Sequence, residues 1–266
     1  MGQSKPPYSH DSDQYTQKKA FFNSVLTIYG RNSVLEALQQ GLNIYRIHMA
    51  ESNRPAAVLK AIAELAEKNH IEVRYHSKQA LSRISKNSKQ DQGVAADIAC
   101  PEHQAFDDWN ATHSGSALTI LALDGIHNPQ NLGMIIRSAA ASGIHGILLS
   151  PQGNAKLGSL VIKASAGTVF KAPIVHCPDG LAAALTRLRT QGVDVIAMRA
   201  DADDSIMSYH TNKQACYVLG NESHGVSREV ADVCNVHLSI PMHNDVESLN
   251  VAVSASLICY AHHFNG

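Results

Sequence analysis

Several features that would place a chain in a protein class at once are missing from this sequence. None of its 266 residues lies in a run approaching the ~18 uncharged apolar residues that a membrane span requires, so no membrane partner is expected. Residues 1–19 are polar and lack the apolar centre of a secretory signal. The five cysteines stand singly without a C-x-x-C pair, which argues against a disulfide framework or a zinc knuckle. Reduced thiols in a cytoplasmic protein are therefore expected.

The sequence also lacks a strong charge of either sign. Lys and Arg together number 22, Asp and Glu 23, and the formal net charge is −1. A non-specific binder of polyanions is normally basic, so this balance argues against that class. Hydrophobic residues make up 44% of the chain and charged residues 17%, which excludes global disorder. The length suits two domains, and nothing in the sequence repeats at a fixed period.

The charge is nevertheless unevenly distributed. Residues 25–100 carry 10 basic against 7 acidic side chains, whereas residues 118–266 carry 9 against 11. The basic excess is densest in a short polar stretch, and a solvated helix face would explain it. The alternative is a patch that contacts RNA phosphates. Its candidate residues are Lys78, Arg83, Lys86 and Lys89.

The N-terminal part of the chain predicts a small α/β module after a tail. Residues 1–24 are polar and predict a flexible N-terminal tail. Residues 25–100 alternate between helical and strand patterns, and residues 101–117 are acidic and aperiodic, which predicts an interdomain linker. The expected helices start near Val34, Ala56 and Ser77, and the expected strands cover 44–49, 71–75 and 94–98.

The remainder, residues 118–266, alternates apolar strands with helices. This order is typical of an α/β domain with a mostly parallel sheet that helices cover on both faces. The expected strands cover 118–123, 147–149, 172–175, 193–198, 217–219 and 236–240. The expected helices cover 131–142 and 157–166, begin near Asp179 and Ser227, and include a terminal helix carrying Leu249, Val253, Leu257, Tyr260 and Phe264.

Polar residues that suit a binding site gather in three loops. The loops cover 124–133, 220–225 and 241–250, and each follows an apolar strand. Ligands of parallel sheets bind at the carboxyl ends of strands, although ordinary turns also use Gly, Asn and Pro. Neither the G-x-x-x-x-G-K-[S/T] phosphate loop nor the G-x-G-x-x-G fingerprint is present, which disfavours a kinase or a dinucleotide-dependent oxidoreductase. The 15 histidines show no metal-ligand spacing, so no metal is expected.

The three loops resemble the motifs of a known family. The sequence Asn128-Pro129-Gln130-Asn131-Leu132-Gly133, followed by Arg137, resembles the first motif of the SpoU (TrmH) branch of the SPOUT methyltransferases. Gly220-Asn221-Glu222-Ser223-His224-Gly225 resembles the second motif. Ile240-Pro241-Met242, continuing to Glu247-Ser248-Leu249-Asn250, resembles the third. Residues 25–100 resemble the L30e-like substrate-binding domain that precedes this catalytic domain in many members.

This resemblance implies a fold, a cofactor and an assembly. The C-terminal domain would carry a deep trefoil knot, a rare exception to unknotted topology. The cofactor would be S-adenosyl-L-methionine, bound by Gly220, Ile240, Met242 and Leu249. Members of the family are homodimers with sites near the subunit interface, so part of the terminal helix is expected to be an interface.

The resemblance further implies methyl transfer to a ribose 2′-hydroxyl of RNA. Arg137 occupies the position proposed to remove the hydroxyl proton in the family. A guanidinium keeps its proton at any ordinary pH, so we expect Arg137 to clamp a phosphate and stabilise the developing alkoxide instead. Asn131, Glu222, Ser248 and Asn250 would complete the site, with Glu222 orienting Arg137 or an RNA hydroxyl. A purely structural interpretation makes Asn131 and Ser248 helix N-caps.

Three questions of function stay open at this point. Asp91-Gln92-Gly93 stands where the family's first domain commonly ends His-Gln-Gly, which would put a carboxylate on or near the presumed RNA face. The added L30e-like domain favours ribosomal RNA as substrate, with tRNA as the alternative. A non-catalytic RNA-binding or ribosome-assembly factor is a further alternative, but binding alone does not require all five catalytic-type residues.

Overall fold

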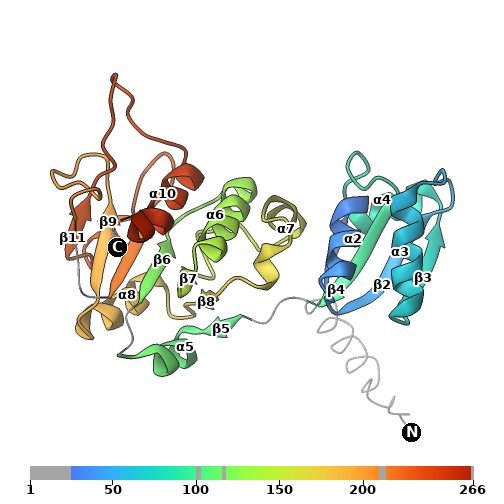
Figure 1. The fold of residues 1–266 in the computed structure, drawn as a ribbon, viewed down its shortest axis with the longest axis horizontal. Coiled ribbons are helices and arrows are strands. Elements are labelled where there is room, and N and C mark those ends of the chain that lie inside the picture. Colours follow the sequence, from blue (N-terminus) through green and yellow to red (C-terminus); the bar gives the residue numbers. More distant parts are fainter. Residues whose placement is uncertain (1–24, 100–102, 116–117, 210–213, 265–266) are drawn as a thin grey trace, which may run out of the picture. The chain divides into compact units, whose positions relative to one another are not determined.

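The protein is described by a computed structural model covering residues 25–99, 103–115, 118–209 and 214–264 (Figure 1). The predicted tail, residues 1–24, lies outside this range. The chain forms two compact units, Met1–Pro101 and Glu102–Gly266, and each is described by itself.

The first unit is built on a four-stranded sheet of order β1-β4-β2-β3. β4 pairs antiparallel with both β1 and β2, and β2 pairs parallel with β3. The parallel pair is joined by a helix, as a parallel connection requires. The elements are β1 (Val25–Tyr29), α2 (Arg31–Gln39), β2 (Ile44–Ala50), α3 (Ala57–Lys68), β3 (Glu72–His76), α4 (Lys78–Ser85) and β4 (Val94–Ala99).

Local sequence explains two helices of this unit. α3 buries Leu59, Ile62 and Ala66, which recur at helical spacing along one face. Ser77 caps α4, because its hydroxyl accepts a hydrogen bond from the backbone N–H of Ala80. The helices expected near Val34, Ala56 and Ser77 are thus present, whereas β1 was not predicted.

The second unit contains a seven-stranded sheet of order β11-β9-β10-β6-β7-β8-β5. Every strand pair recorded in it is parallel, which confirms the predicted α/β class. The trefoil knot stays a prediction. The elements are β5 (Gln104–Ala105), α5 (Phe106–His113), β6 (Thr119–Leu123), α6 (Pro129–Ala141), β7 (Gly146–Leu149), α7 (Ser159–Ala164), η1 (Thr168–Phe170), β8 (Ile174–His176), α8 (Leu181–Thr190), β9 (Asp194–Met198), β10 (Ala215–Leu219), α9 (Arg228–Ala231), β11 (Val236–Leu238) and α10 (Val251–Phe264).

The strands at the centre of this sheet are buried on both faces. Ile120, Leu121, Ala122 and Leu123 of β6 have no exposed surface. Consecutive apolar residues, rather than alternating ones, are the pattern of a strand that helices cover on both sides. Figure 1 shows α6 and α10 beside each other over this sheet, and the Ser256 hydroxyl of α10 donates to Ser138 Oγ of α6 at 2.8 Å.

The segment predicted as a linker is mostly structured in the second unit. β5 extends the sheet by pairing with β8, and α5 follows it directly. Trp109 is 2% exposed, and its indole N–H donates to the carbonyl of His145 at 3.2 Å. The apolar residues Phe106 and Trp109 are too few to create a visible period, while Asp107 and Asp108 suit the first turn of a helix. The acidic composition therefore indicated a helix start and not a linker.

Within the described residues, no helix is long and apolar enough to cross a membrane.

Candidate active site

The first two polar loops meet at the carboxyl ends of neighbouring strands. β6 and β10 lie side by side in the sheet, and each runs into one of these loops. The side-chain amide of Asn221 donates to the carbonyl of Gly125 at 2.9 Å. The Asp124 carboxylate accepts the backbone N–H of Ser227 at 2.7 Å. These bonds fix the second loop against the first.

The 220–225 loop is a tight turn that requires glycine at its start. The backbone N–H of Asn221 donates to the carbonyl of Gly225, and the N–H of Gly225 donates back, both at 2.9 Å. A Cβ on Gly220 would lie 2.0 Å from the carbonyl carbon of Gly225, a main-chain atom that a rotamer change cannot move. Gly220 is thus needed for the turn to close, and the turn in turn presents Glu222.

A chain of three side chains joins all three loops. The Asn131 amide donates to Glu222 Oε1 at 2.5 Å, and the Asn250 amide donates to Asn131 Oδ1 at 3.2 Å. Asn131 is 8% exposed, so both of its polar atoms are used away from bulk water. One buried amide therefore holds Glu222 and Asn250 in register.

The capping roles considered for two of these residues are wrong. α6 begins at Pro129, and its cap is Asn128, whose side chain accepts the N–H of Gln130 at 2.9 Å. Asn131 lies within the helix. At α10 the Asn250 side chain accepts the N–H of Ala252 at 2.9 Å, so Asn250 rather than Ser248 satisfies the first turn. Asn131 and Ser248 are left available for the site.

A pocket of about 600 Å³ opens beside this chain of side chains. Its size lies within the range of small-molecule and cofactor sites. Its wall combines apolar surface from Leu219, Ile240, Met242 and Leu249 with the carboxylates of Glu222 and Glu247. Six of the predicted residues line it, namely Gly220, Glu222, Ile240, Met242, Ser248 and Leu249.

Charged residues that the sequence motifs did not indicate also line the pocket. They follow β9, or belong to or directly follow α9, and are Arg199, Asp201, Arg228 and Asp232. The Arg199 guanidinium donates to both oxygens of Asp201, at 2.9 and 2.8 Å. The hydrogen bond from Arg199 lowers the pKa of Asp201, which keeps that carboxylate ionised. The position directly after a parallel strand was the available signal for Arg199 and Asp201.

Arg137 lies apart from this pocket. It is exposed on α6, six residues beyond Asn131, and it does not line the cavity. Six residues advance a helix by about 600°, so the two side chains leave α6 on different faces. Within the described part of the chain, Glu222 holds Asn131 rather than Arg137. The structure therefore does not bring Arg137 to the other four predicted catalytic residues.

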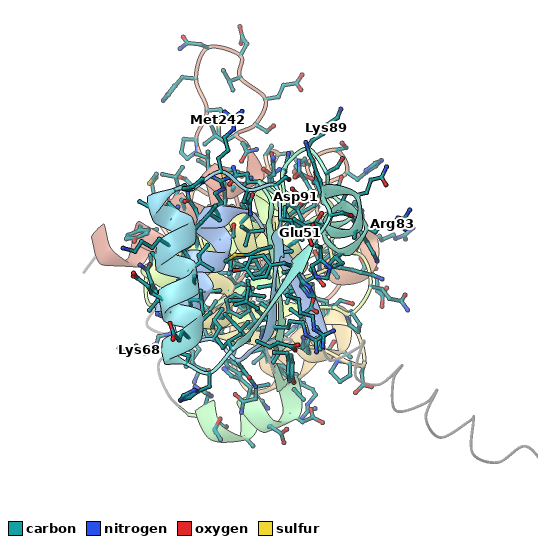
Figure 2. The ribbon with its side chains drawn as sticks, turned by 90° about the vertical axis from the view of Figure 1, so that its right-hand side faces the viewer. Glu51, Lys68, Arg83, Lys89, Asp91 and Met242 are labelled. Atoms are coloured by element: carbon teal, nitrogen blue, oxygen red, sulfur yellow. The ribbon has the colours of Figure 1, made fainter. Side chains whose placement is uncertain are left out.

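The predicted RNA-binding residues are all exposed on the first unit. Lys78 and Arg83 belong to α4, and Lys86 and Lys89 to the loop that follows it. Figure 2 shows the side chains of Arg83 and Lys89 extending outward.

Asp91, which the sequence placed on or near the presumed RNA face, is buried. Asp91 is 5% exposed, and its carboxylate accepts the Ser85 hydroxyl and the backbone N–H of Gly93, each at 3.0 Å. This carboxylate stabilises the turn before β4 and does not face RNA, contrary to the expectation from the sequence.

No group of three or more His, Cys, Asp or Glu side chains suited to a metal ion occurs among residues that the structure describes.

Comparison with known proteins agrees with both units. Residues 118–260 match the family model described as the SpoU rRNA Methylase family, and residues 27–104 match the one described as RNA 2'-O ribose methyltransferase substrate binding. The chain is 32% identical over 235 residues to YacO of Bacillus subtilis, assigned to the TrmH family of tRNA/rRNA methyltransferases. That alignment covers 88% of this chain and 93% of YacO.

Solved structures show the same fold. The SpoU methyltransferase AviRb from Streptomyces viridochromogenes, in complex with the cofactor AdoMet, superposes with a TM-score of 0.75 at 19% identity, covering 97% of this chain and all of AviRb. An rRNA methyltransferase from Sinorhizobium meliloti superposes with a TM-score of 0.70 at 22% identity, covering 91% and 88% of the two chains.

Proposed function

The chain belongs to the SpoU (TrmH) family of RNA methyltransferases, and from this premise we propose that it methylates a ribose 2′-hydroxyl, most directly in ribosomal RNA. The observation that carries the proposal is the Glu222–Asn131–Asn250 chain beside the 600 Å³ pocket. The match of residues 27–104 to a substrate-binding model for ribose methyltransferases supports the hydroxyl as acceptor. The added first domain supports ribosomal RNA over tRNA.

S-adenosylmethionine is the cofactor, and the pocket fits it. Leu219, Ile240 and Leu249 provide apolar surface for a planar base, and backbone groups of the 220–225 turn lie at the edge. The carboxylates of Glu222 and Glu247 suit a ligand with cationic groups better than one with phosphates. When bound, the cofactor supplies an activated methyl group.

The protein's own residues would orient the acceptor. Glu222 has one oxygen occupied by Asn131, so its second oxygen is left to accept a hydrogen bond from the ribose hydroxyl. That bond directs an oxygen lone pair, and the second carboxylate oxygen of Glu222 would accept the hydroxyl proton when the ribose oxygen is methylated. Asn250 and Ser248 extend the polar wall next to Glu222, so positioning and electrostatics supply the rate enhancement.

A homodimer explains both the exposed apolar surface and the placement of Arg137. Val253 and Leu257 of α10 are 49% and 40% exposed, and Met134 of the adjoining α6 is 42% exposed. Such side chains on two packed helices favour association with a second copy. Arg137 lies three residues after Met134, on the same side of α6. We propose that this face is the dimer interface and that Arg137 acts on RNA bound beside the partner's pocket.

The test is methyl transfer with analysis of the product. Purified protein is incubated with S-adenosylmethionine carrying a labelled methyl group and with ribosomal RNA or tRNA, and the RNA is digested to nucleosides. The proposal predicts a labelled 2′-O-methyl nucleoside, formed from ribosomal RNA and not from tRNA. A labelled base-methylated nucleoside would contradict the reaction type, and saturable cofactor binding without transfer would favour a non-catalytic RNA-binding factor.

The dimer has its own test in mixed subunits. Arg137→Ala and Glu222→Ala proteins are each expected to be inactive. If Arg137 serves the partner's pocket, mixing the two restores activity, because one site of each mixed dimer is then intact. Absence of recovery in confirmed mixed dimers would place Arg137 in its own subunit's site.

A further inference from the structure

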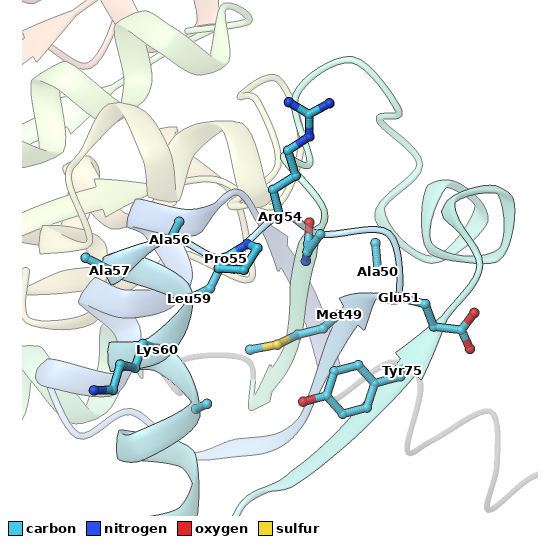
Figure 3. Close-up of a pocket in the computed structure, with 12 residues that line it drawn as sticks. Met49, Ala50, Glu51, Arg54, Pro55, Ala56, Ala57, Leu59, Lys60 and Tyr75 are labelled. Atoms are coloured by element: carbon cyan, nitrogen blue, oxygen red, sulfur yellow. The ribbon is translucent and has the colours of Figure 1, made fainter.

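The first unit contains a second cavity, far along the sequence from the methyl-transfer motifs. It has a volume of about 640 Å³ and lies between α3 and the edge of the sheet formed by β2 and β3 (Figure 3). Met49, Leu59 and Ala63 contribute apolar surface, and Tyr75 of β3 forms one side. We propose that this cavity binds one unpaired nucleotide of the RNA substrate, with the base stacked on Tyr75. The inference rests on the proposed function, since RNA is the ligand in both.

Tyr75 is placed as a stacking surface and not as a core residue. Its side chain is 61% exposed, whereas Met49 beside it is 4% exposed. Its hydroxyl has no hydrogen-bond partner among the residues that the structure describes, so no polar contact accounts for the orientation of the ring. Figure 3 shows the ring reaching across the cavity next to Met49. Exposed aromatic rings are the usual stacking platform for single-stranded nucleic acids, because every base has a flat face that can stack on a ring.

The charges around the cavity favour a nucleotide over an uncharged ligand. Arg54 stands on the loop above the cavity, and its guanidinium forms no ion pair in the described part of the chain. Lys60 lies on the α3 side, 3.7 Å from the carboxylate of Glu64, in an exposed pair that water screens. An unpaired guanidinium is well suited to a phosphate. The ligand thus has an apolar plane and a negative charge.

The surroundings of the cavity suit a continuing RNA strand. The first turn of α3, Ala57 to Leu59, borders the cavity, and no side chain caps this helix, so its N–H groups add to the attraction for phosphate. Tyr75 is three residues before Lys78, and only Ser77 separates β3 from α4. α4 packs on the other face of the sheet, where Leu81 contacts Ala50, so an RNA strand that places a base on Tyr75 would reach the predicted basic residues by passing around the β3 edge (Figure 2). The opposite side carries Glu51, which directs the phosphate toward Arg54.

The experiment measures binding of a short RNA by the full-length protein. The probe is a fluorescently labelled 12-nucleotide RNA of random sequence, followed by anisotropy. Tyr75→Ala is expected to weaken binding roughly five- to a hundredfold, the range for loss of one stacked base. Tyr75→Phe keeps the ring and is expected to bind like the wild type. Arg54→Ala is expected to reduce the slope of log K for RNA binding against log salt concentration by about 0.7.

Matched controls separate the cavity from the general surface. Tyr45→Ala removes another exposed tyrosine of the same unit, and Lys68→Ala removes a cation at the far end of α3 (Figure 2). Both are expected to bind the probe like the wild type. The inference is overturned if Tyr75→Ala binds as tightly as the wild type, if both tyrosine variants lose binding equally, or if the wild-type protein does not bind the probe.

Failure of the cavity proposal can be told apart from failure of the proposed function. Transfer of labelled methyl groups to RNA is measured on the same protein samples. A wild-type protein that binds the 12-nucleotide RNA through Tyr75 but transfers no methyl group would contradict the proposed function and leave the cavity assignment standing. Normal methyl transfer by the wild type, together with unchanged RNA binding by Tyr75→Ala, would support the proposed function and overturn the cavity assignment.

Discussion

The two units place their polar side chains in opposite ways. In the second unit the strands are apolar and the chemistry is concentrated in loops at their carboxyl ends. In the first unit polar residues lie within the strands themselves, where His48 Nε2 is 3.0 Å from Asp97 Oδ2 and His48 Nδ1 is 2.9 Å from His76 Nε2. The Thr27 hydroxyl donates to the same carboxylate at 2.7 Å. A site made of loops appears in the sequence as short motifs, whereas a surface shared by several strands does not.

The sharpest way to test the loop-built site is to remove its central amide. Asn131→Ala leaves Glu222 and Asn250 without the group that holds them in register. We expect methyl transfer to fall by about 100-fold or more, as for loss of one preorganised donor, while the Kd for S-adenosylmethionine changes by no more than a few-fold. Turnover at saturating RNA and calorimetric cofactor binding measure the two effects.

The matched control for that variant is Asn128→Ala, which removes the cap of the same helix. It is expected to cost about 1 kcal/mol of stability and leave turnover nearly unchanged. Equal turnover by Asn131→Ala and the wild type would remove Asn131 from the site.

The next largest effect is expected from the turn that presents Glu222. In Gly220→Ala the new Cβ would collide with the main chain of Gly225, so the turn must open. Cofactor binding is expected to weaken at least tenfold, measured by calorimetry. Gly158→Ala serves as the control, because its φ of −106° suits alanine and its nearest neighbour would be 3.7 Å away. Tight cofactor binding by Gly220→Ala would show that the closed turn is unnecessary.

Acid sensitivity is expected in the second unit because two of its histidines are partly buried. Burial, with a contribution from nearby His176, lowers the pKa of His103 to about 4, and burial also lowers the pKa of His176. The unfolded chain therefore binds protons near pH 6.5 that the folded chain does not yet bind. Stability should be complete above about pH 6.5 and fall as the pH drops toward 4.

Denaturant midpoints at pH 7, 5.5 and 4.5 measure this loss. His103→Leu should be less sensitive to pH than the wild type, whereas His237→Gln, at an exposed position on β11, should match it. Identical pH profiles for the wild type and His103→Leu would contradict the assignment.

The smallest effects are expected from the basic residues of the first unit. Arg83 and Lys89 are exposed and spread over α4 and its following loop, so each would contribute one screened phosphate contact. Arg83→Ala and Lys89→Ala are each expected to weaken RNA binding a few-fold. Each should also reduce the slope of log K for RNA binding against log salt concentration by about 0.7. Lys68→Ala is the control. If all three variants bind alike, the basic patch is only a solvated surface.

The sequence predicted the second unit well because its signals are local. Apolar runs identified the parallel strands, and the three loop motifs identified six of the residues that line the cofactor pocket. The motifs also included Asn131 and Asn250, which do not line the pocket themselves. The hydrogen bond from Asn131 to Glu222 spans 91 positions of sequence and the one from Asn250 to Asn131 spans 119, and no local pattern shows such bonds. Arg137 was grouped with them by motif, although its exposed position separates it from the pocket of its own chain.

Elsewhere the sequence was less informative, for identifiable reasons. α5 has too few apolar residues to show a period, so a helix with a buried tryptophan was interpreted as a linker. Asp91 was expected on the RNA face, because composition does not show that Ser85 and Gly93 satisfy its carboxylate within the fold. Tyr75 and Arg54 come together only when β3 pairs with β2 and α3 packs above them, so the second cavity has no signal in the linear sequence.

The central claim is tested most directly by mapping 2′-O-methyl nucleosides in ribosomal RNA and tRNA from cells with and without the gene. The account predicts loss of one 2′-O-methyl mark in ribosomal RNA, restored by the wild-type gene and not by genes encoding Asn131→Ala or Arg137→Ala. Unchanged 2′-O-methylation together with a lost base methylation would contradict it.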